Sequence, residues 1–278
     1  MSLIGQTKRL LRAYDVHPKK RYGQNFMVDS IILQRLVSYA DLSKEDVVLE
    51  VGAGFGFLTR LLTEKCKKVV ALEVDPKLVQ ALRKQLMNLQ NVELVEGDIL
   101  EACLQPFDKV VSTPPYSISS PLLFRLLEQT FRLAVLTFQE EFAERLAAPV
   151  GSKEYSRLTV TIYYKADVEL LDRVPRTAFF PPPDVDSTIV RLKPKKEPPF
   201  HVSDEAEFFE LLRTVFTQRN KKLRNAILFY LLKKGMTKAK AQELADSLTF
   251  HDKRVRNLAP EDFGALTNEI LEKTSVLR

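Results

Sequence analysis

The stretch VVLEVGAGFGFLT, residues 47–59, decides the fold class of this chain of 278 residues. Its first five residues form a largely apolar run of strand length, and residues 57–65 predict a helix. Gly52, Gly54 and Gly56 lie between them, where the missing side chains let the backbone turn tightly and approach a ligand. The spacing differs from the GxGxxG pattern of dinucleotide-binding proteins, so a tight structural turn remains the alternative.

Apolar runs alternate with helical segments downstream of this motif. Strands are predicted at 69–74, 92–95, 109–112 and 133–138, and helices from Pro76 onward, at 119–130 and at 139–147. The alternation indicates an α/β fold with a Rossmann-like, doubly wound parallel sheet. Three later segments have no long helices between them and are predicted to form an antiparallel edge of the same sheet: 156–164, 168–174 and 187–192.

A charged, proline-rich stretch, KPKKEPP at residues 193–199, predicts a domain boundary because such segments interrupt both strands and helices. Beyond it, apolar residues recur at helical spacing. Helices are predicted at 207–216, 223–232, 237–244 and 260–271, with Thr237 capping the third. We therefore expect a larger α/β domain, residues 1–196, and a small all-helical domain, residues 197–278.

The formal net charge is +6, and the basic residues are concentrated in two blocks. Residues 1–28, expected as a basic N-terminal arm, contain six basic residues against Asp15 alone, and residues 213–256 contain twelve against three acidic ones. Two basic blocks around a net acidic middle indicate a face that binds a polyanion such as nucleic acid. Four side chains of the second block are expected to contact phosphates, with a solvated helix face as the alternative: Arg219, Lys221, Lys222 and Arg224.

The composition argues against several other classes of protein. Cys66 and Cys103 are the only cysteines and the three histidines are far apart, so neither a disulfide framework nor a metal site is expected. No apolar run is long enough to span a bilayer, and residues 1–14 lack the apolar core of a secretory signal. We therefore expect a cytoplasmic protein with no membrane contact.

Acidic side chains follow the second and third predicted strands. Glu73 lies 21 residues after Gly52, where a carboxylate can accept hydrogen bonds from a ribose diol. Asp75 is close by, but the helix that starts at Pro76 makes it a helix cap instead. Asp98 could accept from an adenine amino group while Ile99 packs on the ring, with a simple turn aspartate as the alternative. Ligands of open α/β sheets bind at these strand ends, which favours a nucleotide-like cofactor.

The loop Ser-Thr-Pro-Pro-Tyr, residues 112–116, closes the fourth predicted strand. Its two prolines stiffen the backbone and remove two amide donors, so carbonyl oxygens can face a ligand. If the Pro114 carbonyl and the Thr113 hydroxyl accept hydrogen bonds from an exocyclic amino group, its nitrogen shifts towards the tetrahedral geometry of a nucleophile, while Tyr116 stacks on the base. Together with the glycine turn, the loop indicates methyl transfer from S-adenosylmethionine to a nucleobase amino group. The alternative is a stiff loop around a buried tyrosine.

Several segments together resemble one family, the small-subunit ribosomal RNA adenine dimethyltransferases (KsgA-like). The loop at 113–116 resembles the NPPY or NLPY motifs of amino-methyltransferases, and residues 21–28 (RYGQNFMV) resemble a cofactor-covering segment of the family. Similar matches are EVGAGFGFLT (50–59), ALEVD (71–75), GDIL (97–100), QRNKKLRN (218–225) and the FxPxPxVxS pattern of Phe179, Pro181, Pro183, Val185 and Ser187. The resemblance covers essentially the whole chain.

The resemblance implies dimethylation of N6 on two adjacent adenosines near the 3′ end of small-subunit rRNA, during ribosome maturation. We expect the protein to be a monomer. The cofactor contacts that it implies are Gln24, Asn25, Phe26, Gly52, Gly54, Glu73, Val74, Asp98, Ile99 and Thr113. The target base would be surrounded by Thr113, Pro114, Pro115, Tyr116 and Phe179, with Phe179 stacking opposite Tyr116. Thr113 stands where most of the family has asparagine, and serine at the equivalent place in cytosine-N4 methyltransferases indicates that a hydroxyl can serve.

Other functions are also compatible with these motifs. One is a mono-methyltransferase of adenine N6 or cytosine N4, against which the basic helical tail and the Phe179 segment argue. Another is an RNA-binding ribosome-assembly factor with weak methyl transfer, favoured only by Thr113. Relatives of the family methylate one adenosine of large-subunit rRNA, a substrate that the helical tail disfavours.

Overall fold

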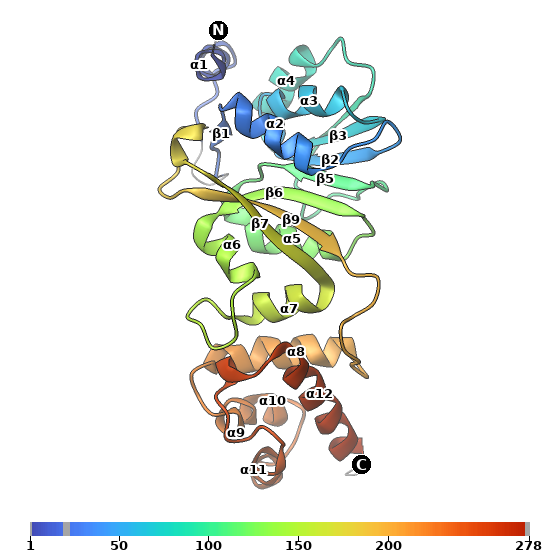
Figure 1. Cartoon of the computed structure of the whole chain (residues 1–278), viewed down its shortest axis with the longest axis vertical. Helices are drawn as coiled ribbons and strands as arrows, with labels where there is room; N and C mark the ends of the chain where they lie inside the picture. The colour runs from blue at the N-terminus through green and yellow to red at the C-terminus, as the bar shows by residue number, and fades with distance from the viewer. Residues whose placement is uncertain (1, 19–22, 276–278) are drawn as a thin grey trace. The chain divides into compact units, whose positions relative to one another are not determined.

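The computed structural model describes residues 2–18 and 23–275 (Figure 1). Seven strands form one sheet in the order β4-β3-β2-β5-β6-β9-β7, and the short strands β1 and β8 pair separately. The strands are β1 (Phe26–Met27), β2 (Val47–Val51), β3 (Lys68–Glu73), β4 (Val92–Glu96), β5 (Lys109–Ser112), β6 (Leu133–Gln139), β7 (Ala166–Val174), β8 (Phe179–Phe180) and β9 (Ser187–Pro194).

The sheet is parallel from β4 to β6 and antiparallel between β6 and β9. This arrangement confirms the predicted doubly wound sheet with an antiparallel edge. Because strands β2, β3, β4 and β5 run in the same direction, their carboxyl ends meet at one edge, and the segments that follow them can line a common site.

Helices cover both faces of the sheet. Alternate strand residues such as Val48, Val69 and Val111 pack in one cluster with Leu36 of α2 (Ser30–Tyr39) and Leu62 of α3 (Phe57–Thr63). Their neighbours along the strands point to the opposite face and are buried as well. Burial on both faces explains why the strands read as continuous apolar runs rather than alternating patterns. The remaining helices of this part are α1 (Leu3–Ala13), α4 (Pro76–Gln85), α5 (Ser119–Leu127) and α6 (Glu140–Leu146).

The chain divides into two compact units. The first comprises the described residues up to Ala143 together with Val168–Pro194, and the second comprises Glu144–Asp167 together with the described residues from Lys195 onward. This division differs from the expected single break after residue 196, because residues 144–167 group with the C-terminal helices. Tyr155 and Tyr164 of that segment are buried among the apolar side chains of those helices.

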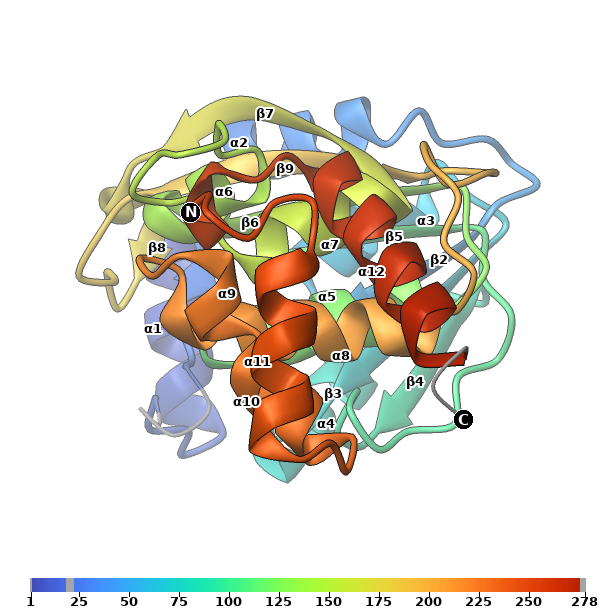
Figure 2. The same cartoon turned by 90° about the horizontal axis from the view of Figure 1, so that it is seen from below.

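The second unit is helical and contains α7 (Arg157–Lys165), α8 (Glu205–Val215), α9 (Leu223–Ala226), α10 (Leu228–Lys233), α11 (Lys238–Ser247) and α12 (Pro260–Ser275). Helix α8 contacts α7, α9, α10 and α12, and Figure 2 shows the last helices of the chain gathered around it. Thr237 caps α11 as predicted by accepting a hydrogen bond from the Lys240 amide. Within residues 2–18 and 23–275, no helix is long and apolar enough to cross a membrane.

Two predicted elements are wrong in this unit. Residues 156–164 were expected as a strand but form helix α7, which begins with a capping box between Ser156 and Thr159. The run of β-branched residues at 159–162 is buried throughout, so no helical periodicity was visible in the sequence. The helix expected at 223–232 is interrupted at Ile227, between α9 and α10.

Candidate functional site

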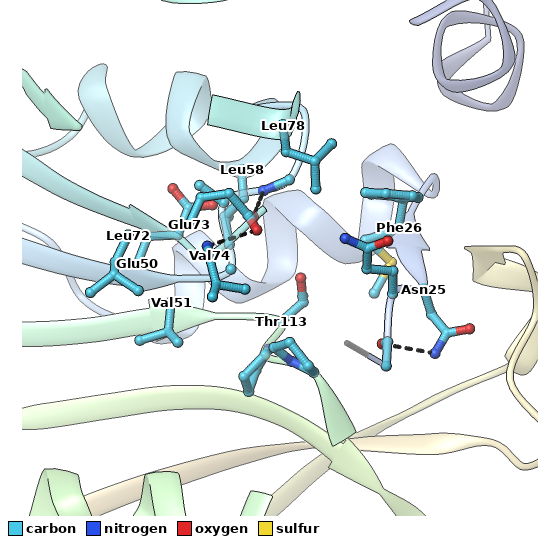
Figure 3. A pocket seen from close by; sticks show the side chains of 18 of the residues that line it. Asn25, Phe26, Glu50, Val51, Leu58, Leu72, Glu73, Val74, Leu78 and Thr113 are labelled. Carbon is cyan, nitrogen blue, oxygen red and sulfur yellow. Dashed lines mark hydrogen bonds between the residues drawn. The ribbon is translucent and has the colours of Figure 1, made fainter. Parts of the chain in front are cut away.

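A cavity of about 270 Å³ lies at the carboxyl edge of the sheet, with walls formed only by residues of the first unit. Figure 3 shows Glu73 and Val74 on one side of it, Asn25 and Phe26 on the other, and Thr113 between them. The structure brings together in this one cavity all the residues that the sequence predicts for the cofactor and the target base: Gln24, Asn25, Phe26, Gly52, Gly54, Glu73, Val74, Asp98, Ile99, Thr113, Pro114, Pro115, Tyr116 and Phe179.

The glycine turn between β2 and α3 forms one wall of the cavity. Gly52, Gly54 and Gly56 all have positive φ angles, at 74°, 59° and 78°, a region that residues with a side chain adopt only under strain. Cβ atoms would also have little room, because one on Gly54 would lie 3.3 Å from the Phe26 ring. The turn therefore presents bare backbone to the cavity.

The Glu73 carboxylate is held in one orientation by three backbone amides. Oε2 accepts from Gly54 at 2.9 Å, and Oε1 accepts from Val74 at 2.9 Å and from Asp75 at 3.0 Å. Burial raises the pKa of Glu73, and the three amide hydrogen bonds oppose that shift. A carboxylate fixed in this way keeps lone pairs for hydroxyl donors of a ligand.

Asp75, the alternative partner for a ribose, has a structural role. Its Oδ1 accepts from the Lys77 amide at the start of α4, and its Oδ2 accepts from the Gln24 side chain at 3.1 Å. The side chain is fully buried and does not line the cavity. Of the two carboxylates, Glu73 is the one that the geometry offers to a ligand.

Asp98 and Ile99 form another part of the wall, after β4. Asp98 Oδ1 accepts from the Leu100 amide at 2.9 Å, so the turn role considered from the sequence is present. The residue also lines the cavity, and the Ile99 side chain beside it is buried. A turn that holds Asp98 in place is compatible with a second hydrogen bond to a ligand amino group.

The N-terminal segment closes the cavity opposite the sheet. Asn25 donates to the Gly23 carbonyl at 3.2 Å, and Phe26 pairs through β1 with Phe180 of β8. The Phe26 ring lies 4.8 Å from that of Phe55 in the glycine turn. Arg21 and Tyr22, the first two residues of the motif in this segment, lie outside the described residues.

The loop after β5 packs directly on the glycine turn. Ser112 donates from its hydroxyl to the Val51 carbonyl at 2.5 Å. A Cβ on Gly52 would lie 3.2 Å from Pro115 Cδ, and one on Gly23 would lie 3.4 Å from Pro115 Cβ. Pro115 therefore packs against the backbone on two sides, which fixes Thr113 and Pro114 relative to the glycine turn.

Tyr116 and Phe179 meet edge to face, with ring centroids 6.0 Å apart and planes at 73°. This differs from the expected pair of opposed faces, because a base does not fit between rings that contact each other at this angle. The Tyr116 hydroxyl bonds to the buried Ser187 hydroxyl at 2.7 Å, and Phe179 is held in β8. In this conformation the rings form one wall of the cavity rather than two.

Glu50, which precedes the glycine turn, also lines the cavity and was not predicted as a site residue. It is 2% exposed, and its Oε2 has no hydrogen-bond partner among the described residues. Burial, with the charge of Glu73 adding to it, raises the pKa of Glu50 to about 8. The sequence signal was present, because an acidic residue inside an apolar strand needs a partner.

A buried carboxyl with one oxygen left without a partner, a fixed second carboxylate and a bare glycine backbone fit a ligand that carries both cationic groups and hydroxyl groups. The Glu50 carboxyl can pair with a cation, since a buried acid that no cation neutralises gains most from one. The predicted cofactor, S-adenosylmethionine, has a sulfonium, an ammonium and a ribose diol, so the residues present fit it.

The four predicted phosphate-binding residues lie in the second unit and have different partners. Arg219 donates to the Tyr155 carbonyl at 2.9 Å, while Lys222 and Arg224 lie 2.8 and 3.4 Å from Asp252. Lys221 is exposed and forms no ion pair with a described residue. A backbone bridge between Lys222 and Arg254 adds one further cation, Arg254, that the linear motif did not include.

Comparisons with known proteins show the family to which the chain is similar. A family model described as ribosomal RNA adenine dimethylase matches residues 16–270. The curated relatives include a probable ribosomal RNA small subunit methyltransferase A of Methanosarcina acetivorans, which is 45% identical over 91% of this chain and 94% of that protein. The protein of the same name from Thermococcus kodakarensis is 40% identical over 96% of this chain and 95% of its own length.

Two solved structures are similar over most of the chain. A dimethyladenosine transferase from Plasmodium falciparum has a TM-score of 0.78 at 32% identity and covers 90% of this chain and 98% of that one. The 23S rRNA methyltransferase ErmE has a TM-score of 0.67 at 30% identity and covers 88% and 99%.

Proposed function

Because the chain belongs to the ribosomal RNA adenine dimethylase family, we propose that it dimethylates N6 of two adjacent adenosines near the 3′ end of small-subunit rRNA. It is an S-adenosylmethionine-dependent rRNA adenine dimethyltransferase. The proposal of N6 dimethylation rests on one cavity that the two motifs share. In this cavity the glycine turn and the loop 113–116 are in contact through Gly52 and Pro115. A methyl donor on the turn and an amino group on the loop would be neighbours there.

The cofactor half of the cavity is assigned to the glycine turn and the residues after β3 and β4. Glu73 accepts hydrogen bonds from the ribose diol, Asp98 accepts from the adenine amino group, and Ile99 packs on the adenine ring. Glu50 pairs with a cationic group of the cofactor. Gln24, Asn25 and Phe26 cover the site from the other side and exclude water.

In the base half, the protein positions the nucleophile. S-adenosylmethionine supplies an electrophilic methyl carbon when bound. The Thr113 hydroxyl oxygen and the Pro114 carbonyl accept hydrogen bonds from the N6 hydrogens and direct the nitrogen lone pair at the donor. No strong base is needed, because the proton leaves the cationic product nitrogen after transfer. Positioning of this kind provides much of the rate in a reaction between two bound groups.

The edge-to-face contact of Tyr116 and Phe179 restricts how the base enters. A base can stack on the exposed side of Tyr116 without separating the two rings, a contact worth about 1–3 kcal/mol. Phe179 then acts by holding the Tyr116 ring in position. The family acts on unstacked bases, so the adenosine must leave its helix or loop stack before it reaches the cavity.

Binding of the rRNA outside the cavity is assigned to the basic second unit. Lys221, Lys222 and Arg224 would contact phosphates, and Arg219 would hold this segment in place. The substrate we propose is the maturing small ribosomal subunit, bound by a monomer in the cytoplasm. Binding through phosphates predicts a strong dependence on salt.

The test is methyl transfer from labelled S-adenosylmethionine to small ribosomal subunits that lack the modification, followed by nucleoside analysis. We expect N6,N6-dimethyladenosine at two adjacent positions. Monomethyladenosine alone would instead support the mono-methyltransferase alternative and place the defect in the second step. Binding of subunit and cofactor without transfer would support the assembly-factor alternative.

Large-subunit rRNA is a second candidate substrate, favoured by the similarity to ErmE over 88% of this chain. The same assay with unmethylated large subunits distinguishes the two candidate substrates. Incorporation into the large subunit alone would overturn the proposed substrate while leaving the reaction intact.

A further inference from the structure

We propose that helix α1 is a second RNA-binding element, whose basic face holds the phosphodiester backbone beside the target base. This inference rests on the proposed rRNA substrate and adds a contact surface to it. Three basic residues, Lys8, Arg9 and Arg12, are exposed on α1. Arg12 lies four positions after Lys8 and three after Arg9, so the three side chains share one face of the helix.

The opposite face of α1 is fixed to the wall of the cavity. Thr7 and Leu10 are buried, and Leu10 packs in one apolar cluster with Phe26, Phe55 and Leu78. Those last three side chains line the cavity itself. Apolar contacts thus hold the helix in place, and its charges are not needed for docking.

The basic face reaches the target-base side of the cavity. Lys8 Nζ lies over the ring of Phe180, 5.2 Å from its centroid, and Phe180 directly follows Phe179. Phe179 in turn contacts Tyr116, the residue assigned to base stacking. A nucleotide whose base is in the cavity carries a phosphate on each side, so the strand must pass close to this rim.

The charges of α1 are not neutralised by neighbouring acids. None of Lys8, Arg9 and Arg12 forms an ion pair with a residue of the described ranges. Asp15, the only acid among the first 28 residues, is 2.7 Å from Lys77 Nζ and 3.1 Å from His17. The ion pair with Lys77 and the neighbouring His17 hold the pKa of Asp15 below its usual value. Three uncompensated cations on an ordered helix suit a polyanionic strand.

The experiment compares the full-length K8Q/R9Q/R12Q variant with a matched control, K65Q/K67Q/K84Q. The control loses the same charge from three exposed lysines of the first unit, and Lys65 and Lys67 precede β3, at the sheet edge opposite the cavity. Binding to unmethylated small subunits is measured over a range of salt, together with KM and kcat for methyl transfer, cofactor affinity and thermal unfolding.

For the α1 variant we expect a higher KM for the subunit, an unchanged kcat at saturating RNA, and unchanged cofactor affinity and melting temperature. The slope of log affinity against log salt should fall by about 0.7 for each lost phosphate contact with a single strand. If the α1 variant and the control have the same salt slope and the same KM, the proposal is wrong. Wild-type protein that methylates no rRNA would instead overturn the proposed function, and the binding slopes would still test α1.

Discussion

Pro115 packs against the Cα of Gly52, so closely that a Cβ on Gly52 would lie 3.2 Å from Pro115 Cδ. One residue belongs to the turn assigned to the methyl donor and the other to the loop assigned to the acceptor. Because Gly52 also has a φ of 74°, both its conformation and its surroundings exclude a side chain. The rigid Pro115 ring and the Gly52 backbone thereby fix the separation of the turn and the loop.

Gly52→Ala should therefore weaken cofactor binding and methyl transfer together. The left-handed backbone costs about 1–2 kcal/mol with a Cβ, and the contact with Pro115 adds to this. Isothermal titration with S-adenosylmethionine and thermal unfolding measure the two effects. Gly97→Ala is the control for stability, since a Cβ there meets nothing within 4 Å. The double variant G52A/P115A should recover part of the loss; equal losses with and without Pro115 would show that the contact does not matter.

Glu50→Gln should change how stability depends on pH. The pKa of Glu50 in the folded protein, about 8, is above that of an exposed glutamate. The protonated side chain therefore contributes its full stabilisation of the fold below about pH 4.5, and this contribution is lost as the pH rises to about 8. Relative to wild type, the glutamine variant should gain up to about 1.4 kcal/mol per pH unit across that interval and nothing more above it. Urea unfolding from pH 5 to 9 measures this, with the exposed Glu45→Gln as control.

The same substitution should weaken cofactor binding, because a neutral amide does not pair with a cation. Wild-type affinity should rise between pH 6 and 8 as the carboxyl ionises more easily in the complex, with release of a proton. A pH-independent affinity in wild-type protein would contradict the assigned role of Glu50.

Thr113→Ala should lower kcat/KM by roughly 5- to 30-fold, the equivalent of a hydrogen bond worth about 1–2 kcal/mol. Thr113→Ser keeps the acceptor oxygen and is the matched control. The ratio of dimethyladenosine to monomethyladenosine should also fall in the alanine variant, because the second methylation has only one N6 hydrogen left to orient. If the rate and the ratio of dimethyladenosine to monomethyladenosine are both unchanged, Thr113 does not take part in the reaction.

Tyr116→Phe should retain most of the activity, whereas Tyr116→Ala should lose the stacking contribution of about 1–3 kcal/mol. Burial raises the pKa of Tyr116, so the phenol stays protonated and does not act as a base. Ser187→Ala leaves the Tyr116 hydroxyl without its partner and should impair activity more than Tyr116→Phe does. Single-turnover rates distinguish the three variants.

In the second unit, Lys221→Gln should lower the slope of log RNA affinity against log salt by the amount expected for about one phosphate contact. It should leave stability unchanged. Arg219→Gln should lower the melting temperature, because Arg219 donates to the Tyr155 carbonyl. Joint neutralisation of Arg219, Lys221, Lys222 and Arg224 should weaken RNA binding with little effect on cofactor affinity. A quadruple variant with an unaltered salt slope would show that these side chains do not contact phosphates.

The strand–turn–helix motif at 47–59 and the alternation of strands and helices after it predicted the sheet and the position of the cavity. In a parallel sheet every carboxyl end reaches the same edge, so residues after different strands converge without knowledge of any long-range contact. Local patterns were misleading for 156–164. Residues 158–162 of α7 are all buried, and this continuous run hides the amphipathic period by which a helix is identified.

The sequence by itself determined the fold class, the family and many of the residues that line the cavity, because all three depend on local pattern and chain order. Only the tertiary structure decided that Tyr116 and Phe179 meet edge to face, that Glu50 is buried with a raised pKa, and that Arg219 is bound to a backbone carbonyl. Each of these depends on atoms from segments far apart in the chain. Ring angles, desolvation and pairing of charges are set by the packing of such segments, which no local pattern encodes.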